Sequence, residues 1–186
     1  MTEITLVWSR LPLAEADLGA IQGEVEQEHP GYRLLAWDGL VADELMDTFV
    51  ASRHAMDDMP GGGDPPTWDR EAVRNAVARV EGRGEHLHTV AAATDDGEIV
   101  GFTELVVPAD GTGDAQHYGT GVLPEHRGRG LGRWIKAAVI VRAHEAHPGL
   151  AGLLTDTVDT NLPMLRISDG LGYVRTHTTR EQVPGS

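Results

Sequence analysis

The most regular hydrophobic pattern in the chain follows a glycine-rich stretch near residue 130. Apolar residues recur there at the spacing i, i+3, i+4, i+7 and i+8, which places them on one face of an α-helix. They are Leu131, Trp134, Ile135, Ala138 and Val139. The pattern predicts a helix that begins near Gly128 and buries one stripe of side chains.

Weaker patterns predict further helices and strands along the rest of the chain. Helical spacing of apolar residues predicts helices over Ala42–Met56, from Asp69 to Gly82, and from Asn161 to Gly170. Short apolar runs between turn residues predict strands over Tyr32–Trp37, His86–Ala93, Ile99–Val107, Gln116–Leu123 and Leu150–Asp156, with one or two more in the tail Tyr173–Val183. We expect the strands between residues 86 and 123 to form an antiparallel meander.

The first thirty residues look like a separate segment. Ile4–Trp8 is strand-like, and Ala14–Glu28 reads as an acidic helix that Pro30 ends. We therefore divide the chain into an N-terminal strand-and-helix appendage, residues 1–30, and a main domain, residues 31–186. An isolated helix of this length is marginal in water, so its apolar face should dock on the main domain or on a second copy of the chain, which would give a homodimer. That face carries Leu18, Ile21 and Val25.

Composition is that of one soluble globular domain. The chain has 186 residues, of which 40% are hydrophobic and 24% charged. It has no apolar stretch near the ~20 residues of a membrane span and no basic-then-apolar leader, so we expect a cytoplasmic location. It contains no Cys, which excludes disulfides, thiolate metal sites and a Cys nucleophile.

Charge is distributed unevenly along the chain. The net charge of −14 argues against binding to nucleic acid or to an anionic membrane. Residues 126–144, however, hold five of the fifteen cations and no Asp or Glu. These cations are Arg127, Arg129, Arg133, Lys136 and Arg142, and Lys136 is the only lysine of the chain. Such a segment is typical of a site for a small anion, although a solvated helix face would give the same pattern.

The glycines of this basic segment suit a phosphate group. Gly128, Gly130 and Gly132 join an expected strand to an expected helix. Glycine lets backbone N–H groups approach a ligand closely, and a helix N-terminus adds unpaired donors and partial positive charge. The spacing is neither that of a P-loop nor that of a dinucleotide-binding turn. A kinase or a dehydrogenase is therefore excluded.

Here the sequence resembles the GNAT superfamily of acyl-CoA-dependent N-acyltransferases. The family signature Gln/Arg-x-x-Gly-x-Gly/Ala is matched by Arg127-Gly-Arg-Gly-Leu-Gly132, and a second family feature recurs at Asn161, Met164 and Leu171-Gly-Tyr173. The resemblance covers residues 31–186 and is greatest to the C-terminal half of tandem-domain actinobacterial-type members. It implies an α/β fold of the α+β type, with a mixed, mostly antiparallel central sheet flanked by helices on both faces.

The resemblance also implies how acetyl-CoA, the expected co-substrate, is held. Backbone amides of the turn would cradle the pyrophosphate, and amides at Val122 and Leu123 would hold the pantetheine and polarise the thioester carbonyl. Asn161 matches a position that commonly contacts CoA. The turn residues are Arg127, Gly128, Arg129, Gly130, Leu131, Gly132 and Arg133. We expect no metal, because His86 and His88 have no third ligand at a suggestive spacing.

Direct attack by an amine needs a group that removes a proton, since an alkylamine with a pKa of ~10 is almost fully protonated at pH 7. Glu104, in an otherwise apolar strand, and Asp156, at a strand end, are the two candidates. The position where many family members have a Tyr general acid is Ser168 here, and a serine hydroxyl is a poor proton donor. The sequence therefore leaves the proton donor open.

The resulting prediction is an N-acetyltransferase that moves an acetyl group from acetyl-CoA to a primary amine of a small molecule. The alternative is a non-catalytic CoA-binding sensor or scaffold. Both would contain the same phosphate-binding turn. Only acceptor-dependent release of CoA separates them.

Overall fold

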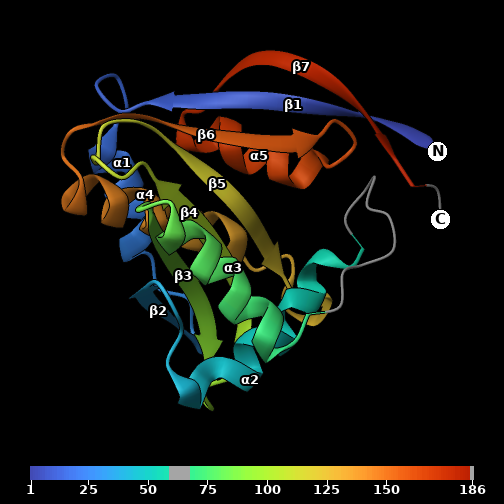
Figure 1. The fold of residues 1–186 in the computed structure, drawn as a ribbon. Helices are drawn as coiled ribbons and strands as arrows, with labels where there is room; N and C mark the ends of the chain where they lie inside the picture. The colour runs from blue at the N-terminus through green and yellow to red at the C-terminus, as the bar shows by residue number, and fades with distance from the viewer. Residues whose placement is uncertain (59–67, 185–186) are drawn as a thin grey trace.

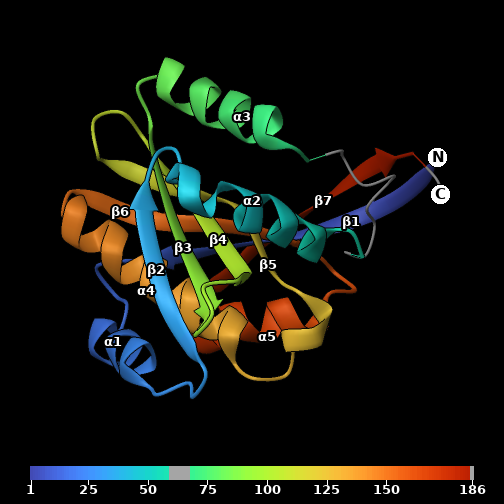
Figure 2. The same cartoon turned by 90° about the horizontal axis from the view of Figure 1, so that it is seen from below.

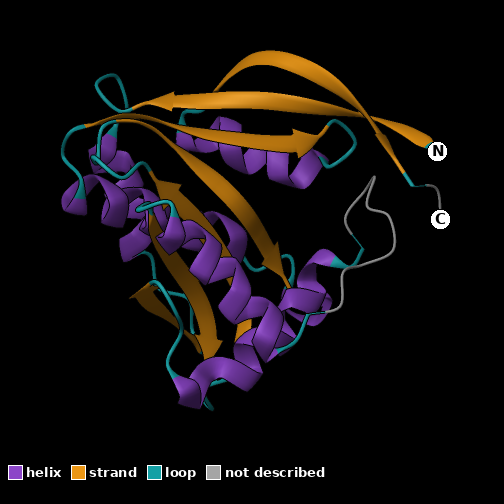
Figure 3. Ribbon diagram, in the orientation of Figure 1, coloured by secondary structure: helices purple, strands orange, loops and turns teal. Residues whose placement is uncertain are grey.

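The computed structural model describes residues 1–58 and 68–184. Within them, seven strands form one sheet in the order β2-β3-β4-β5-β6-β1-β7 (Figure 1, Figure 3). Their bounds are β1 Thr2–Pro12, β2 Tyr32–Asp38, β3 His86–Thr94, β4 Ile99–Val107, β5 Gly113–Val122, β6 Leu150–Val158 and β7 Val174–Val183. Ile99–Val107 has the bounds that its apolar run predicts.

The sheet is mixed and mostly antiparallel. Strands β3 to β5 form the expected antiparallel meander, β2 pairs antiparallel with β3, and β1 pairs antiparallel with both β6 and β7. The parallel pair is β5 with β6, and its register covers only Gly113–Gln116 against Leu150–Leu154. The predicted fold class is therefore confirmed.

Helices cover both faces of this sheet (Figure 2). The helices α1 (Leu18–Glu26), α4 (Leu131–Ala146) and α5 (Leu162–Leu171) contribute to the larger apolar core, and α2 (Asp43–Ser52) and α3 (Arg70–Gly82) cover the other face. A 3₁₀ turn, η1 (Arg53–Met56), continues α2 toward β5. No helix within the described residues is both long and apolar enough to cross a membrane.

Short polar side chains set where several helices begin. Asp69 caps α3 by accepting a hydrogen bond from the amide of Ala72 at 2.7 Å, and Asn161 caps α5 by accepting one from Met164 at 3.4 Å. Such caps satisfy amides that have no partner inside the helix. Both helices therefore begin one residue after the polar residue from which the sequence predicts them to start.

The N-terminal segment lies against the rest of the chain on two sides. Strand β1 is hydrogen-bonded between β6 and β7, and α1 packs on α4. Ile21 is buried in the same core as α4, and the indole of Trp134 donates a hydrogen bond to the carbonyl of Val25 at 3.0 Å. The apolar face of α1 is thus covered within one chain, while the boundary at residue 30 stays a prediction.

Candidate functional site

The parallel pair β5–β6 opens into a fork. Its register ends at Gln116 and Leu154, and beyond them the two strands diverge. The side-chain amide of Gln116 spans the base of the fork, donating to the carbonyl of His117 at 3.2 Å and to the carboxylate of Asp156 at 3.5 Å. Two cavities meet in this fork, and both are lined by Thr120 and Met164.

The larger cavity, of about 610 Å³, lies between the start of α4 and α5. It brings together most of the residues that the sequence assigns to the cofactor. These are Val122, Arg127, Gly128, Gly130, Leu131, Gly132, Arg133 and Asn161. Leu123 and Arg129 do not line it.

The glycine turn at the mouth of this cavity needs its glycines. Gly128 and Gly130 have φ angles of +77° and +78°, a region that L side chains rarely adopt, and Gly130 is the N-cap of α4. A Cβ on Gly132 would lie 3.2 Å from the side chain of Ile167. The first amides of α4 therefore face the cavity at the positive end of the helix dipole, an arrangement that fits a phosphate.

The arginines of the basic segment are tied to the protein rather than left free. Arg127 makes two hydrogen bonds to the carboxylate of Asp58, at 2.7 and 2.8 Å, and a third to the carbonyl of Val122. Arg133 pairs with Glu24 of α1 at 2.8 Å. The predicted anion site thus consists mainly of backbone amides, with these side chains fixing the turn.

The remaining cations of the segment lie elsewhere. Arg129 sits over the ring of Tyr32, and Arg142 pairs with Asp38 at the far end of α4. Lys136 is buried and faces the smaller cavity. The five cations therefore do not form one anion site, because successive helical residues point in different directions.

The two amides assigned to pantetheine differ in availability. The amide of Leu123 donates to the carbonyl of Val100 at 2.8 Å, so it has no free hydrogen for a ligand. Alternate residues of a strand direct their N–H groups to opposite edges, which turns the amide of Val122 toward the fork. The N–H of Val122 is therefore available to a ligand, whereas the N–H of Leu123 is used by a hydrogen bond within the sheet.

Glycines 119 and 121 allow η1 to cover β5 closely. A Cβ on Gly121 would lie 3.0 Å from both the Cβ of Ala55 and the sulfur of Met56. Because neither glycine carries a side chain, Met56 reaches the fork and becomes part of the smaller cavity. Glycine at these two positions thus lets η1 pack on β5 and lets Met56 reach the cavity.

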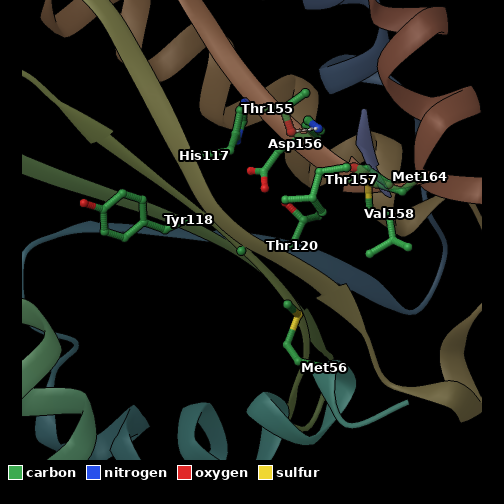
Figure 4. Close-up of a pocket in the computed structure, with 12 residues that line it drawn as sticks. Met56, His117, Tyr118, Thr120, Thr155, Asp156, Thr157, Val158 and Met164 are labelled. Atoms are coloured by element: carbon green, nitrogen blue, oxygen red, sulfur yellow. Dashed lines mark hydrogen bonds between the residues drawn. The ribbon is translucent and has the colours of Figure 1, made fainter. Parts of the chain in front are cut away.

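The smaller cavity, of about 180 Å³, occupies the fork (Figure 4). Side chains of His117 and Asp156 enter the space from the two diverging strands. Burial raises the pKa of the Asp156 carboxyl, and the charge of Glu181 on β7 raises it further. Leu6 of β1 and Tyr118 of β5 add apolar surface to this cavity. Asp156, one of the two predicted proton acceptors, therefore lies in the cavity wall.

A buried polar group that sequence reasoning missed lies behind Asp156. Lys136 is only 1% exposed, and its amine donates hydrogen bonds to the hydroxyls of Thr155 at 3.2 Å and Ser168 at 3.0 Å. His117 and Tyr173 share a hydrogen bond of 2.6 Å beside it. The sequence signal was available, because the only lysine of the chain falls within an otherwise apolar stretch of helix.

Ser168, at the position where many family members have a Tyr acid, lines neither cavity. It is buried and holds the Lys136 amine. Its hydroxyl therefore affects the smaller cavity only by holding the Lys136 amine in place.

Glu104, the other predicted proton acceptor, lies on the opposite face of the sheet from α4. Its carboxylate pairs with Arg53 at 2.7 Å, and both side chains are buried. Arg53 itself is stacked among the rings of Phe49, Phe102 and Trp68. Glu104 does not line either cavity, although one of its oxygens lies within 4 Å of where a Cβ of Gly119 would be.

His86 and His88 lie at the other end of the sheet. His88 contacts Asp38 at 2.6 Å and His147 at 2.8 Å. No set of three or more ligating side chains within the described ranges is arranged to hold a metal ion.

Comparison with solved structures shows where this architecture recurs. The tandem GNAT protein of the clavulanic acid biosynthesis pathway matches with a TM-score of 0.72 and 22% identity, over 100% of this chain and 55% of that one. An N-acetyltransferase from Sphaerobacter thermophilus matches with a TM-score of 0.62 and 16% identity, over 97% of this chain and 52% of that one. A GNAT-family protein from Novosphingobium aromaticivorans matches with a TM-score of 0.58 and 17% identity, over 97% and 63%.

These likenesses concern the fold. The chain spans between about half and two-thirds of the length of these structures. No curated protein sequence matches it. The model of the acetyltransferase (GNAT) family, however, matches residues 43–173. That match covers well over half of the sequence and includes the glycine turn, the fork and α5, so the chain belongs to the GNAT acetyltransferase family.

Proposed function

We propose that this protein transfers an acetyl group from acetyl-CoA to a primary amine of a small molecule by direct attack. The observation that carries the proposal is the meeting of two cavities in the β5–β6 fork. The larger one has the amides of the α4 N-terminus at its mouth, and the smaller one has a carboxylate in its wall. A donor substrate and an acceptor can thus reach the same point from opposite sides.

In this proposal the larger cavity takes acetyl-CoA. The α4 amides bind its pyrophosphate, and the free backbone N–H of Val122 donates a hydrogen bond to the pantetheine or to the thioester carbonyl. Asn161 lines the same cavity, where it can contact the cofactor while its side chain caps α5. Beyond Gln116, β5 is no longer paired with β6, so its backbone N–H groups on that edge are open to the pantetheine.

The smaller cavity takes the acceptor amine. Asp156 is the better-placed proton acceptor, because its carboxylate lines the cavity whereas Glu104 is engaged by Arg53. Burial raises the pKa of Asp156, which brings its proton affinity closer to that of an amine losing its proton during attack. The volume of about 180 Å³ suits a side-chain-sized amine rather than a folded protein surface.

The proposal is tested in two steps. Acetyl-CoA should raise the melting temperature of the protein, whereas ATP or NAD at the same concentration should raise it much less. The protein should then release free thiol from acetyl-CoA only when an amine is added. The amines to compare are polyamines, amino acids, aminoglycosides and peptide N-termini.

Each result has a clear reading. Equal stabilisation by NAD would contradict the assignment of the larger cavity. Stabilisation by acetyl-CoA without thiol release for any amine would indicate the non-catalytic CoA-binding alternative instead.

A further inference from the structure

Lys136 is an unusual residue to find inside this protein. It is the only lysine of the chain, it is 1% exposed, and it lines the smaller cavity from the second turn of α4. A buried ammonium is costly unless it is paired, and the eight other buried residues of the same helix are all apolar. An apolar residue could be buried there without the free energy needed to desolvate an ammonium group. Packing alone therefore does not explain the amine.

The contacts of the Lys136 amine leave it able to gain and lose a proton. Its hydrogen-bond partners are two hydroxyls, Thr155 and Ser168, which occupy two of its three hydrogens. Within the described residues no carboxylate lies within 4 Å of it, since Lys136 takes part in no ion pair there. Two neutral acceptors stabilise the charged form less than a carboxylate would.

The charged and titratable groups that face the amine come from three elements. Asp156 of β6 favours the charged form of Lys136, whereas burial, and after it the charge of Lys136, lowers the pKa of His117 of β5. The ring of Tyr173, just after α5, lies 5.0 Å from the amine. Burial outweighs Asp156 and lowers the pKa of Lys136 to about 7. Burial likewise raises the pKa of Tyr173, so its hydroxyl stays neutral.

The amine lies in the wall of the smaller cavity, which adjoins the larger one. Ser168, which holds it, lies one turn after Met164 on α5, and Met164 lines both cavities. Asp156 of β6 lines the same cavity as Lys136, and that cavity shares Thr120 and Met164 with the larger one. The amine and the carboxylate thus both line the cavity that adjoins the larger, donor cavity.

We propose that Lys136 is the proton donor to the thiolate that leaves when the acetyl group is transferred. The proposal rests on the acetyl transfer proposed above. It also explains why Ser168 suffices at its position, because the serine hydroxyl holds the donor rather than acting as one.

The proton balance closes within this pair. The neutral amine attacks the thioester carbonyl, forming the C–N bond, and the C–S bond breaks with its electron pair on sulfur. Asp156 takes the proton that the attacking nitrogen loses, and the Lys136 ammonium gives a proton to the thiolate. The products are the amide and CoA as its thiol, and a proton passing from Asp156 to Lys136 through solvent restores both groups.

The kinetic test compares Lys136→Met with Arg142→Met, which removes a cation from the exposed far end of the same helix. Lys136→Met should lower kcat by about 10²-fold or more, the usual scale of a general acid, with the affinity for acetyl-CoA within twofold of wild type. The loss of kcat/KM above pH 7, where Lys136 gives up its proton, should disappear in this variant. Arg142→Met should keep both the rate and the pH profile.

A second readout does not depend on turnover. With one lysine in the chain, protein labelled with ¹³C at lysine Cε gives a single lysine signal, whose titration reports Lys136 alone. CoA should shift this signal and raise the pKa of Lys136, because a thiolate favours the ammonium, whereas desulfo-CoA should do so much less. If Lys136→Met does not fold, Lys136→Gln serves in the kinetic test.

The outcomes separate this inference from the proposed function. A wild-type protein that acetylates an amine, together with a Lys136→Met variant of equal rate and unchanged pH profile, would overturn the role of Lys136 alone. A lysine signal that titrates near 10 and ignores CoA would overturn it as well. A wild-type protein that acetylates no amine would overturn the proposed function, and a lysine signal that still responds to the CoA sulfur would support the position of Lys136.

Discussion

Trp8 of β1 and Asp156 of β6 lie directly opposite each other in the antiparallel pairing of their strands. The residue two places earlier on β1, Leu6, lines the smaller cavity itself. The first strand therefore holds in place the strand that carries the carboxylate. A change in β1 should reach the cavity through these backbone hydrogen bonds.

The first prediction concerns the contribution of this strand to stability. Leu11→Ala should lower the free energy of unfolding by about 2–5 kcal/mol, because Leu11 is completely buried at the centre of the larger core. Leu40→Ala, at a leucine that is 41% exposed, should change it by only about 0.5 kcal/mol. Denaturant unfolding measures both. Equal, small effects would mean that the first thirty residues are a separable appendage.

The glycine turn leads to the second prediction. Gly130→Val should abolish the rise in melting temperature caused by acetyl-CoA, since valine disfavours a φ of +78° at the N-cap of α4. Gly82→Val, at an exposed glycine with open space around it, is the matched control and should keep the rise. A folded Gly130→Val protein with unchanged affinity would remove the turn from the binding site.

The third prediction ranks the two carboxylates. Asp156→Asn should lower kcat/KM by about 10²-fold or more near neutral pH, as expected when a general base is removed. Glu104→Gln should have the smaller kinetic effect but should destabilise the fold by on the order of 3 kcal/mol, because it leaves Arg53 buried without its anion. Asp159→Asn, at an exposed aspartate three residues after Asp156, is the control. The reverse ranking in kcat/KM would assign the proton to Glu104.

The fourth prediction concerns stability and pH. Burial lowers the pKa of Lys136 to about 7 in the folded protein, well below the value of 10.5 for an exposed lysine, so between these pH values the unfolded chain binds more protons than the folded one. Stability from this group therefore rises as the pH increases from 7, by at most about 1.4 kcal/mol per pH unit. Lys136→Met should lose that rise and be more stable than wild type at pH 6. Chemical denaturation between pH 6 and 9 gives the free energy of unfolding against pH for wild type and for Lys136→Met. Equal slopes for the two proteins would contradict the lowered pKa of Lys136.

The elements that the sequence predicted well are those encoded locally. The apolar run of Ile99–Val107, the helical spacing after Leu131 and the glycine turn each depend on neighbouring residues only. The caps Asp69 and Asn161 likewise act on amides three residues away. Eight of the ten residues assigned to the cofactor therefore line the larger cavity, and their contact with a cofactor stays a prediction.

Contacts between distant residues could not be predicted in the same way. Nothing in residues 2–12 indicates that they pair with β6 and β7, because the partners lie between 140 and 181 residues later. The ion pair of Arg53 with Glu104 and the contact of Lys136 with Ser168 also join separate elements. Charge clustering in sequence suggested one anion site, but the helix turns Lys136 and Arg142 away from it.

The burial of the only lysine also bears on how exposed the protein is to chemical acetylation by the proposed donor. Acetyl-CoA acetylates exposed lysine amines slowly even without catalysis, and an acetyltransferase holds that reagent close to its surface. Here the surface cations are arginines, whose guanidinium groups are far weaker nucleophiles than amines. The amine of the only lysine, Lys136, is buried in the wall of the smaller cavity. An acetyl donor bound as proposed would therefore meet arginines and no lysine amine on the surface of the protein.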